Sequence, residues 1–158
     1  MFGKTNLIII GVILVVMAAI GSAYVDVIEG GGGKVVGADP MNVELVAQGQ
    51  TIYSKSCADC HGSNLEGQPD WKIKGADGML PAPPHDATGH TWHHPDKMLF
   101  EVTKLGGGHN APAGFISGMP AFGDSLSDED IYAVLAYIKS RWPDDIRKRH
   151  KMMSERAG

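Results

Sequence analysis

The sequence predicts an all-α protein: a small helical domain of about four to five helices with long loops, preceded by one N-terminal transmembrane helix. Three observations predict this class. Apolar residues recur at helical spacing in several segments, no run of alternating apolar residues is bounded by turns as a strand would be, and a long uncharged stretch lies near the N-terminus. The 21 glycines and 9 prolines account for the long loops.

Net charge and cysteine content exclude two other classes of protein. A formal charge of −4 argues against nucleic-acid binding, which requires a basic face. Two cysteines are too few for the disulfide framework of a small secreted scaffold. The function must therefore be argued from particular residues and their spacing.

Residues 1–25 are predicted to form a membrane anchor in contact with the lipid bilayer. The stretch from Leu7 to Val25 carries no charge, and as a helix it spans about 28 Å, enough for the hydrocarbon core. A cleaved signal peptide is the alternative, because Gly21-Ser22-Ala23 offers a small-x-small site. Lys4 favours a cytoplasmic N-terminus, which predicts a single-pass protein of the inner membrane with its domain in the periplasm.

Residues 26–42 are predicted to form a flexible tether. The segment contains four consecutive glycines, Gly30 to Gly33, and an Asp39-Pro40 pair, and it has no sustained apolar period. A flexible chain of this length has a root-mean-square reach of about 23 Å. A domain on such a tether moves while it stays near the membrane.

The globular domain is expected over residues 43–142, with a helix at each end. Apolar residues at helical spacing predict a first helix from Val43 into Cys57. The sequence Ser127-Asp128-Glu129-Asp130 resembles a capping box and precedes apolar residues at the same spacing. Pro143 ends this last helix, because proline cannot continue it.

A shorter helix and a basic tail are expected in two further segments. A shorter helix is expected over residues 95–105, with Pro95 in its first turn and Gly106 just past its end. Residues 143–158 are predicted to be a basic C-terminal tail, with a cluster at residues 147–151. A solvated helix end is the preferred interpretation of this cluster, and contact with anionic headgroups or an acidic partner is the alternative.

The motif Cys57-Ala58-Asp59-Cys60-His61 carries the strongest chemical signal. Cysteines at i and i+3 on one helical face can form thioethers to the two vinyl groups of one haem, and His61 then lies where it can bind the iron. Structural zinc would need a second ligand pair, a thioredoxin-like pair would need a βαβ context, and both are missing; two buried spectator cysteines remain the alternative. The motif predicts one covalently bound haem c.

A second axial ligand is expected from Met119. It lies in Gly118-Met119-Pro120, where the flanking residues constrain the loop so that the thioether can point at the iron. Met79 and Met98 are rivals, but Met98 falls on a predicted helix and Met79 lacks a comparable frame. A methionine that fills a gap in the core is the alternative for Met119.

These two motifs make the chain similar to the class I c-type cytochromes, small single-haem proteins that carry electrons outside the cytoplasmic membrane. In that family a glycine and an aromatic residue of the first helix pack against an aliphatic and an aromatic residue of the last. The matching positions here are Gly49, Tyr53, Val134 and Tyr137. The resemblance also implies that the backbone carbonyl of a loop residue accepts a hydrogen bond from the haem-binding histidine. Pro83 or Pro84 could supply this carbonyl, and the bond would orient the ring of His61.

The stretch from Gly67 to His94 is longer and richer in His and Trp than in small members of that family. Its histidines at positions 85, 90, 93 and 94 are expected to lie in a solvated loop, with one of them or Trp92 bound to a haem propionate. One histidine could instead replace Met119 as axial ligand. Together they could also bind copper or another periplasmic metal.

The predicted function is one-electron transport without catalysis. Nothing in the sequence indicates an acid–base pair or a pocket for a small-molecule substrate. The resemblance implies membrane redox complexes as partners, with a quinol–cytochrome c oxidoreductase as electron donor and a terminal oxidase or a photosynthetic reaction centre as acceptor. Two alternatives stay open: a fixed haem subunit of a larger membrane dehydrogenase or oxidase complex, and a copper-handling protein that uses the histidine-rich loop.

Overall fold

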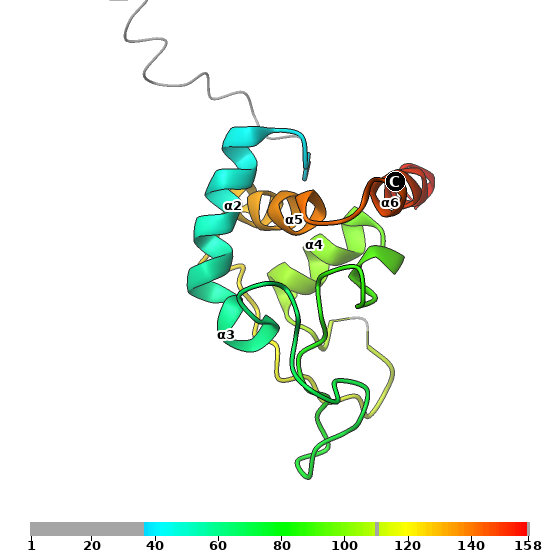
Figure 1. Ribbon diagram of the computed structural model, residues 1–158. Helices are drawn as coiled ribbons and strands as arrows, with labels where there is room; N and C mark the ends of the chain where they lie inside the picture. The colour runs from blue at the N-terminus through cyan, green and yellow to red at the C-terminus, as the bar shows by residue number, and fades with distance from the viewer. Residues whose placement is uncertain (1–36, 110, 158) are drawn as a thin grey trace, which may run out of the picture. The chain divides into compact units, whose positions relative to one another are not determined.

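The computed structural model describes residues 37–109 and 111–157 (Figure 1). These residues form five α-helices and one 3₁₀ turn, without a strand among them, which confirms the predicted all-α class. The elements are α2 (Val43–Ser56), α3 (Ala58–His61), η1 (Thr91–His93), α4 (Asp96–Leu105), α5 (Asp128–Ser140) and α6 (Asp144–Ala157).

The predicted membrane anchor and most of the predicted tether lie outside the described residues. Within the described ranges, no helix has both the length and the apolar character needed to cross a membrane. Residues 37–42, expected as the end of the tether, belong to the same compact unit as the domain. Ala38 is buried there, so the ordered structure begins before α2.

Helix α2 begins where its sequence supplies a cap. The side chain of Asn42 accepts a hydrogen bond from the backbone N–H of Leu45 at 3.0 Å, which satisfies one free donor of the first turn. Leu45, Gly49 and Tyr53 recur every four residues and are buried, so they form the core-facing stripe of the helix.

Helix α5 crosses α2 at Gly49 (Figure 1). A Cβ atom built on Gly49 would overlap the backbone carbonyl of Ala133 and lie 3.0 Å from Cβ of Tyr137. One turn further along α2, the rings of Tyr53 and Tyr137 pack with their centroids 5.4 Å apart. The expected packing of these helices is therefore confirmed, and its reason is the close approach of two backbones.

The start of α5 is a capping box, as predicted. The hydroxyl of Ser127 accepts from the N–H of Asp130 at 3.1 Å, and the Asp130 carboxylate accepts from the N–H of Ser127 at 3.1 Å. The Ser127 hydroxyl also donates to the Asp130 carboxylate at 2.8 Å, and this bond is the largest cause of the lowered pKa of Asp130. Most residues of α5 are buried, since the helix packs against both α2 and α4.

Helix α4 begins one residue later than predicted. Pro95 has an extended backbone and is the N-cap, so Asp96 is the first helical residue. The helix ends at Gly106, whose φ of +95° lies in the region that favours glycine. This glycine turns the chain into the segment that contains Met119.

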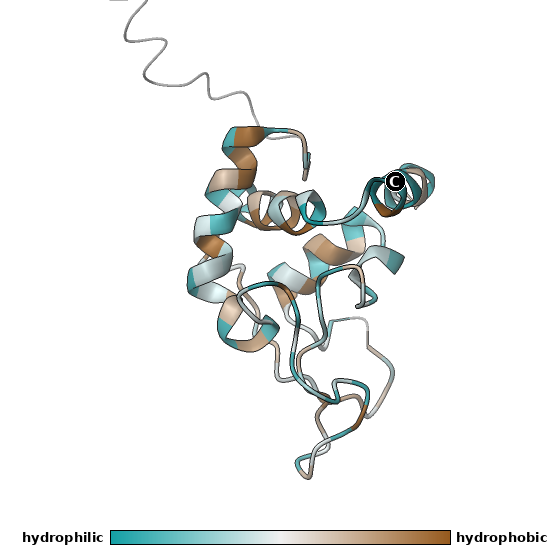
Figure 2. Cartoon of the chain, in the orientation of Figure 1, coloured by the Kyte–Doolittle hydropathy of each residue, from teal (hydrophilic) through white to brown (hydrophobic). Residues whose placement is uncertain are grey.

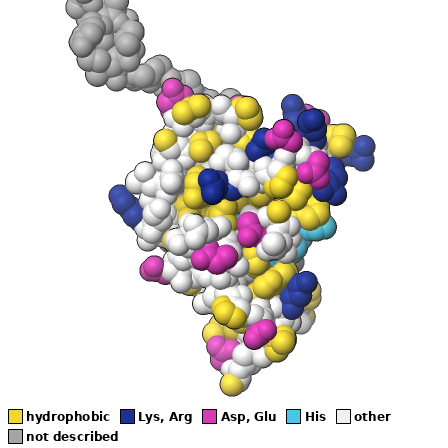
Figure 3. Space-filling model, in the orientation of Figure 1, with side chains coloured by type: hydrophobic (Ala, Val, Ile, Leu, Met, Phe, Trp, Pro, Cys, Tyr) yellow, Lys and Arg dark blue, Asp and Glu magenta, His cyan; other side chains and the backbone are white. Residues whose placement is uncertain are grey.

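Residues 144–157, within the predicted basic tail, form helix α6. The helix is mainly hydrophilic in comparison with α5 (Figure 2), and Lys and Arg side chains gather over it (Figure 3). It nevertheless packs on the domain, because Ile146 and His150 are buried. The guanidinium group of Arg147 donates to the carbonyls of Ser140 and Trp142 at 3.2 and 2.7 Å, which links α6 to the end of α5.

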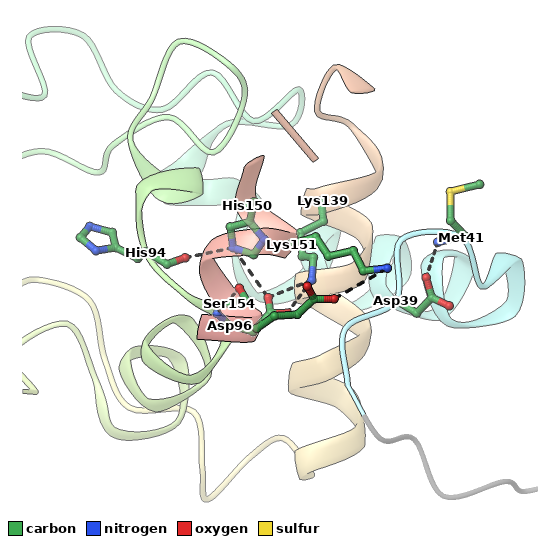
Figure 4. A network of polar contacts seen from close by, with 9 residues as sticks. Asp39, Met41, His94, Asp96, Lys139, His150, Lys151 and Ser154 are labelled. Atoms are coloured by element: carbon green, nitrogen blue, oxygen red, sulfur yellow. Dashed lines mark hydrogen bonds and ion pairs between the residues drawn. The ribbon is translucent and has the colours of Figure 1, made fainter. Parts of the chain in front are cut away.

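A polar network joins α4, α5 and α6 (Figure 4). The ammonium group of Lys139 donates to both carboxylate oxygens of Asp96, at 2.9 and 2.7 Å. The N–H of Asp96 donates to the hydroxyl of Ser154 at 3.0 Å. Nε2 of His150 lies 2.9 Å from the carbonyl oxygen of His94, the residue just before Pro95. These contacts attach α6 to the start of α4.

Candidate haem-binding site

The two thiols lie at the junction of α2 and α3. The N–H of Cys57 donates to the carbonyl of Tyr53, the last bond of the α2 pattern, and the N–H of His61 donates to the carbonyl of Cys57, each at 2.9 Å. Both cysteines are free; Cys57 is partly buried and Cys60 is exposed. One short turn therefore presents two thiols and an imidazole, as the sequence predicts.

The thiol of Cys57 is held in its protonated form at neutral pH. Burial, with a smaller effect from the neighbouring Cys60, raises its pKa to about 11. A thioether forms when a thiol adds across a vinyl double bond. The unpaired state of both cysteines leaves them available for that reaction.

The imidazole of His61 is buried and oriented by a backbone carbonyl. Nδ1 of His61 lies 2.9 Å from the carbonyl oxygen of Pro83, and since a carbonyl only accepts, Nδ1 carries the proton. Burial lowers the pKa of His61 and so favours the neutral ring, although the bond to Pro83 partly offsets this effect. In the part of the chain that the structure describes, Nε2 makes no hydrogen bond, so its lone pair is available to a metal.

The structure distinguishes Pro83 from Pro84. The Pro84 carbonyl lies 3.4 Å from the hydroxyl of Thr91 and makes no bond with His61. Two residues position the segment that carries the Pro83 carbonyl. Gln68 bonds both the N–H and the carbonyl of the preceding Ala82, and Gly67 leaves room for the segment, since a Cβ there would lie 2.7 Å from the Pro83 carbonyl carbon. Sequence reasoning missed Gly67 and Gln68. A glycine six residues after the histidine was the available signal.

The loop with Met119 is fastened to the end of α4. The N–H of Gly107 donates to the carbonyl of Met119 at 3.1 Å, and the N–H of Phe122 donates to the carbonyl of Thr103 at 3.1 Å. Met119 is half-buried, and a Cβ built on Gly107 would lie 2.9 Å from the Cβ of Met119. The absence of a side chain at Gly107 thus permits this approach. In the sequence, the only sign of this close approach is the run of glycines that follows the helix.

Met79, one of the two rivals, lies beside the same loop. A Cβ on Gly118 would lie 3.5 Å from Sδ of Met79. Met98 is on α4, as predicted, and is 37% exposed. The structure thus brings two thioethers to the loop, while the backbone of Met119 is the one bonded to Gly107.

Apolar side chains stay exposed on the segments that carry these methionines. Leu80, Phe115 and Ile116 are between 37% and 54% exposed. A Cβ on Gly78 would lie 3.9 Å from Cδ1 of Ile116, so the two loops adjoin. A flat, apolar macrocycle fits the combination of uncovered apolar surface, two free thiols and an oriented imidazole.

The histidines of the histidine-rich loop contact different partners. His85 stacks on His61, with ring centroids 3.9 Å apart, and therefore lies beside that imidazole; an axial replacement for Met119 would have to lie across the haem from it. His90 stacks on Trp71 at 5.2 Å, and His93 stacks on Trp92 at 3.7 Å. Over residues 37–109 and 111–157, no three His, Cys, Asp or Glu side chains converge as metal ligands, so the copper-binding alternative gains no support.

Trp92 uses its indole N–H within its own loop. Nε1 donates to the carbonyl of Ala87 at 3.3 Å, and the guanidinium of Arg149 lies 5.1 Å from the ring centroid. The predicted contact of Trp92 with a haem propionate stays a prediction.

Comparison with known proteins identifies the class to which this fold and site belong. The family described as Cytochrome c matches residues 46–142, and the chain belongs to this family. It is thus a c-type cytochrome, an electron-transfer protein that binds haem c covalently. The crystal structure of cytochrome CL from the marine methylotrophic bacterium Methylophaga aminisulfidivorans MPT is similar, with 21% identity, a TM-score of 0.49, and coverage of 76% of this chain and 77% of that one. No curated protein matches the sequence.

Proposed function

We propose that Cys57 and Cys60 hold the haem through thioethers and that His61 and Met119 are its axial ligands. The sequence has two cysteines, so a covalent haem c attached at two positions must use both. The observation that carries the proposal is the bond from Nδ1 of His61 to the Pro83 carbonyl, which leaves Nε2 as the metal-binding nitrogen.

Bound haem supplies an iron that alternates between the ferric and ferrous states, and the chain controls the potential of that change. A buried, neutral His61 coordinates without bringing a charge into the site. The Met119 thioether is a better donor to ferrous than to ferric iron, and a dry site disfavours the more highly charged oxidised centre. Both effects raise the reduction potential.

The cellular role we propose is transport of single electrons between membrane complexes in the periplasm. The donor would be a quinol–cytochrome c oxidoreductase, and the acceptor a terminal oxidase or a photosynthetic reaction centre. The uncharged stretch from Leu7 to Val25 and the glycine-rich residues after it support this role, because an anchored carrier has a high local concentration near membrane partners.

A potentiometric titration of the haem spectrum in the full chain tests the ligand set. We expect one high-potential, one-electron wave. A low potential would contradict the Met119 ligand and point to two nitrogen ligands.

Reduction of the cytochrome by inverted and right-side-out membrane vesicles tests the cellular role. The full chain should be reduced faster than a variant that lacks residues 1–36. Reduction should occur only with vesicles whose periplasmic face is accessible to the cytochrome. Equal rates for the two proteins would contradict tethering. Purification of the full chain at constant stoichiometry with a dehydrogenase or an oxidase would instead support a fixed haem subunit.

A further inference from the structure

His85 makes a direct contact with the histidine of the haem-attachment motif. The rings of His85 and His61 are stacked, with centroids 3.9 Å apart and planes inclined by 22°. The Pro83 carbonyl holds one edge of the His61 ring, at Nδ1, whereas His85 covers a face. The two contacts therefore restrict different motions of the same imidazole.

His85 is itself held from several sides. Its Nδ1 lies 2.8 Å from the hydroxyl of Thr91, and its carbonyl accepts from the indole N–H of Trp142 at 2.7 Å. Its own N–H donates to the carbonyl of Leu65 at 2.8 Å. The Tyr53 ring meets it edge-on, with centroids 6.4 Å apart. The bonds with Leu65 and Trp142 fix the backbone of His85, and the contacts with Thr91 in η1 and Tyr53 in α2 hold its ring.

We propose that His85 is a positioning residue for the axial imidazole: its ring, stacked on His61, fixes the rotation of the His61 ring plane. This inference rests on the proposed axial role of His61. A single hydrogen bond holds one atom and still lets a ring pivot, because carbonyl acceptors tolerate a broad range of directions. A flat group packed on the ring face removes that remaining freedom.

The chemistry of His85 suits this role better than that of an aliphatic residue. A planar side chain matches the face of a second planar ring, whereas a branched chain would touch it only at separate methyl groups. The bond to Thr91, which is itself buried, sets the rotation of the His85 ring.

The orientation of an axial imidazole plane has a measurable consequence. The ring's π orbital interacts with the iron orbital that lies perpendicular to the ring plane. The direction of that plane therefore sets the magnetic anisotropy of ferric haem and the pattern of paramagnetic shifts around the macrocycle. A residue that only stabilised the fold would leave both unchanged in protein that remains folded.

The experiment compares the full-length ferric holoprotein with two variants of His85. His85→Phe keeps a flat ring, and His85→Leu removes it. Low-temperature electron paramagnetic resonance gives the g-values, and proton NMR gives the haem-methyl shifts. We expect His85→Leu to change the g anisotropy and the order of the methyl shifts and to shift the reduction potential, and His85→Phe to stay close to the parent pattern.

A control variant and a milder variant complete the design. Thr88→Val alters an exposed threonine of the same loop, whose hydroxyl donates to Asp86 at 2.6 Å, and it should leave every signal in place. Thr91→Val preserves side-chain shape but removes the hydroxyl that holds His85, and it should move the signals in the direction of His85→Leu. If His85→Leu fails to fold, Thr91→Val decides: unchanged g-values and methyl shifts would overturn the inference.

Failure of the proposed function is distinguishable from failure of this inference. Unchanged g-values and methyl shifts in a folded His85→Leu variant overturn the positioning role alone. A His61→Ala variant whose ferric spectrum matches the parent protein would overturn the ligand assignment and the positioning role with it.

Discussion

Gly49 lies directly against the backbone carbonyl of Ala133, closely enough that no side chain fits between α2 and α5. The same crossing brings Tyr53 against Tyr137 and lets the hydroxyl of Tyr53 donate to the carbonyl of Gly62 at 2.9 Å. Gly62 follows His61 in the chain. The helix crossing thus supports the turn that presents the proposed haem-binding residues.

Gly49→Ala should therefore destabilise the holoprotein by about 3 kcal/mol or more, at the upper end of overpacking costs, because the added methyl group meets backbone atoms that cannot repack. Urea unfolding followed by helical circular dichroism measures the loss. Gln50→Ala, an exposed substitution in the same helix, is the matched control and should change the free energy of unfolding by less than about 0.5 kcal/mol. Equal stability of the two variants would show that the crossing relaxes.

The Lys139–Asp96 pair should contribute much more to stability than the exposed Lys104–Asp128 pair, which also joins two helices. The Lys139 side chain is 10% exposed and that of Asp96 32%, so Lys139→Met leaves a partly buried carboxylate without its cation. We expect a loss of about 2 kcal/mol, below the roughly 3–5 kcal/mol of fully buried pairs, because water still reaches Asp96.

The exposed Lys104–Asp128 pair provides the control. Its side chains are 37% and 53% exposed, and Lys104→Met should cost less than about 1 kcal/mol. A double variant, Asp96→Asn with Lys139→Met, should lose less stability than the sum of the two single variants, because each single variant leaves an unpaired charge and the double variant leaves none. Strict additivity would contradict a direct interaction.

Met119→Ala should open the sixth coordination position of the iron. The expected results are a lower reduction potential and binding of exogenous imidazole or carbon monoxide, because the thioether that favours ferrous iron is gone. Optical titration of the purified holoprotein with these ligands measures the binding, and a potentiometric titration measures the reduction potential. Met79→Ala is the control, since Met79 lies beside the same loop. An unchanged spectrum in Met119→Ala with an open site in Met79→Ala would reverse the assignment.

His150 should make the stability of the domain depend on pH. Burial lowers the pKa of His150 below its ordinary value of 6.5, and Lys139 adds to this effect while Asp96 and the His94 carbonyl oppose it. With Nε2–H donated to that carbonyl, Nδ1 has no partner among the described residues. The fold therefore favours the neutral ring, and protonation would place a charge in the junction of α4, α5 and α6.

The sign of the dependence follows from linkage. Between the lowered pKa of folded His150 and 6.5, the unfolded chain binds more protons, so the free energy of unfolding falls as pH decreases through 6.5. One proton gives a slope of at most about 1.4 kcal/mol per pH unit. His150→Gln keeps a donor for the His94 carbonyl but does not titrate. If His150 is not responsible, the difference in the free energy of unfolding between parent and variant, measured by urea unfolding, should not change with pH.

Much of the local structure was predictable because the signals are local. The Ser127 capping box marks the start of α5 and Gly106 marks the end of α4, each through bonds or dihedral angles within a few residues. The motif from Cys57 to His61 likewise places its three functional side chains on one turn whatever the rest of the chain does. The basic cluster of the tail indicated a solvated helix end, but the packing of α6 on the domain was not predicted, because it depends on two buried residues, Ile146 and His150.

By itself, the sequence determined the helical class, the chemistry of the two thiols and the histidine, and the small residue required at Gly49. The tertiary structure decided which of two adjacent prolines orients His61, that His85 lies on the face of that ring, and that Lys139 pairs with Asp96 from 43 positions away. The physical reason is that helix ends and the spacing along one turn arise from neighbouring residues. Contacts between loops instead depend on how the whole chain closes, and no short stretch of sequence records that.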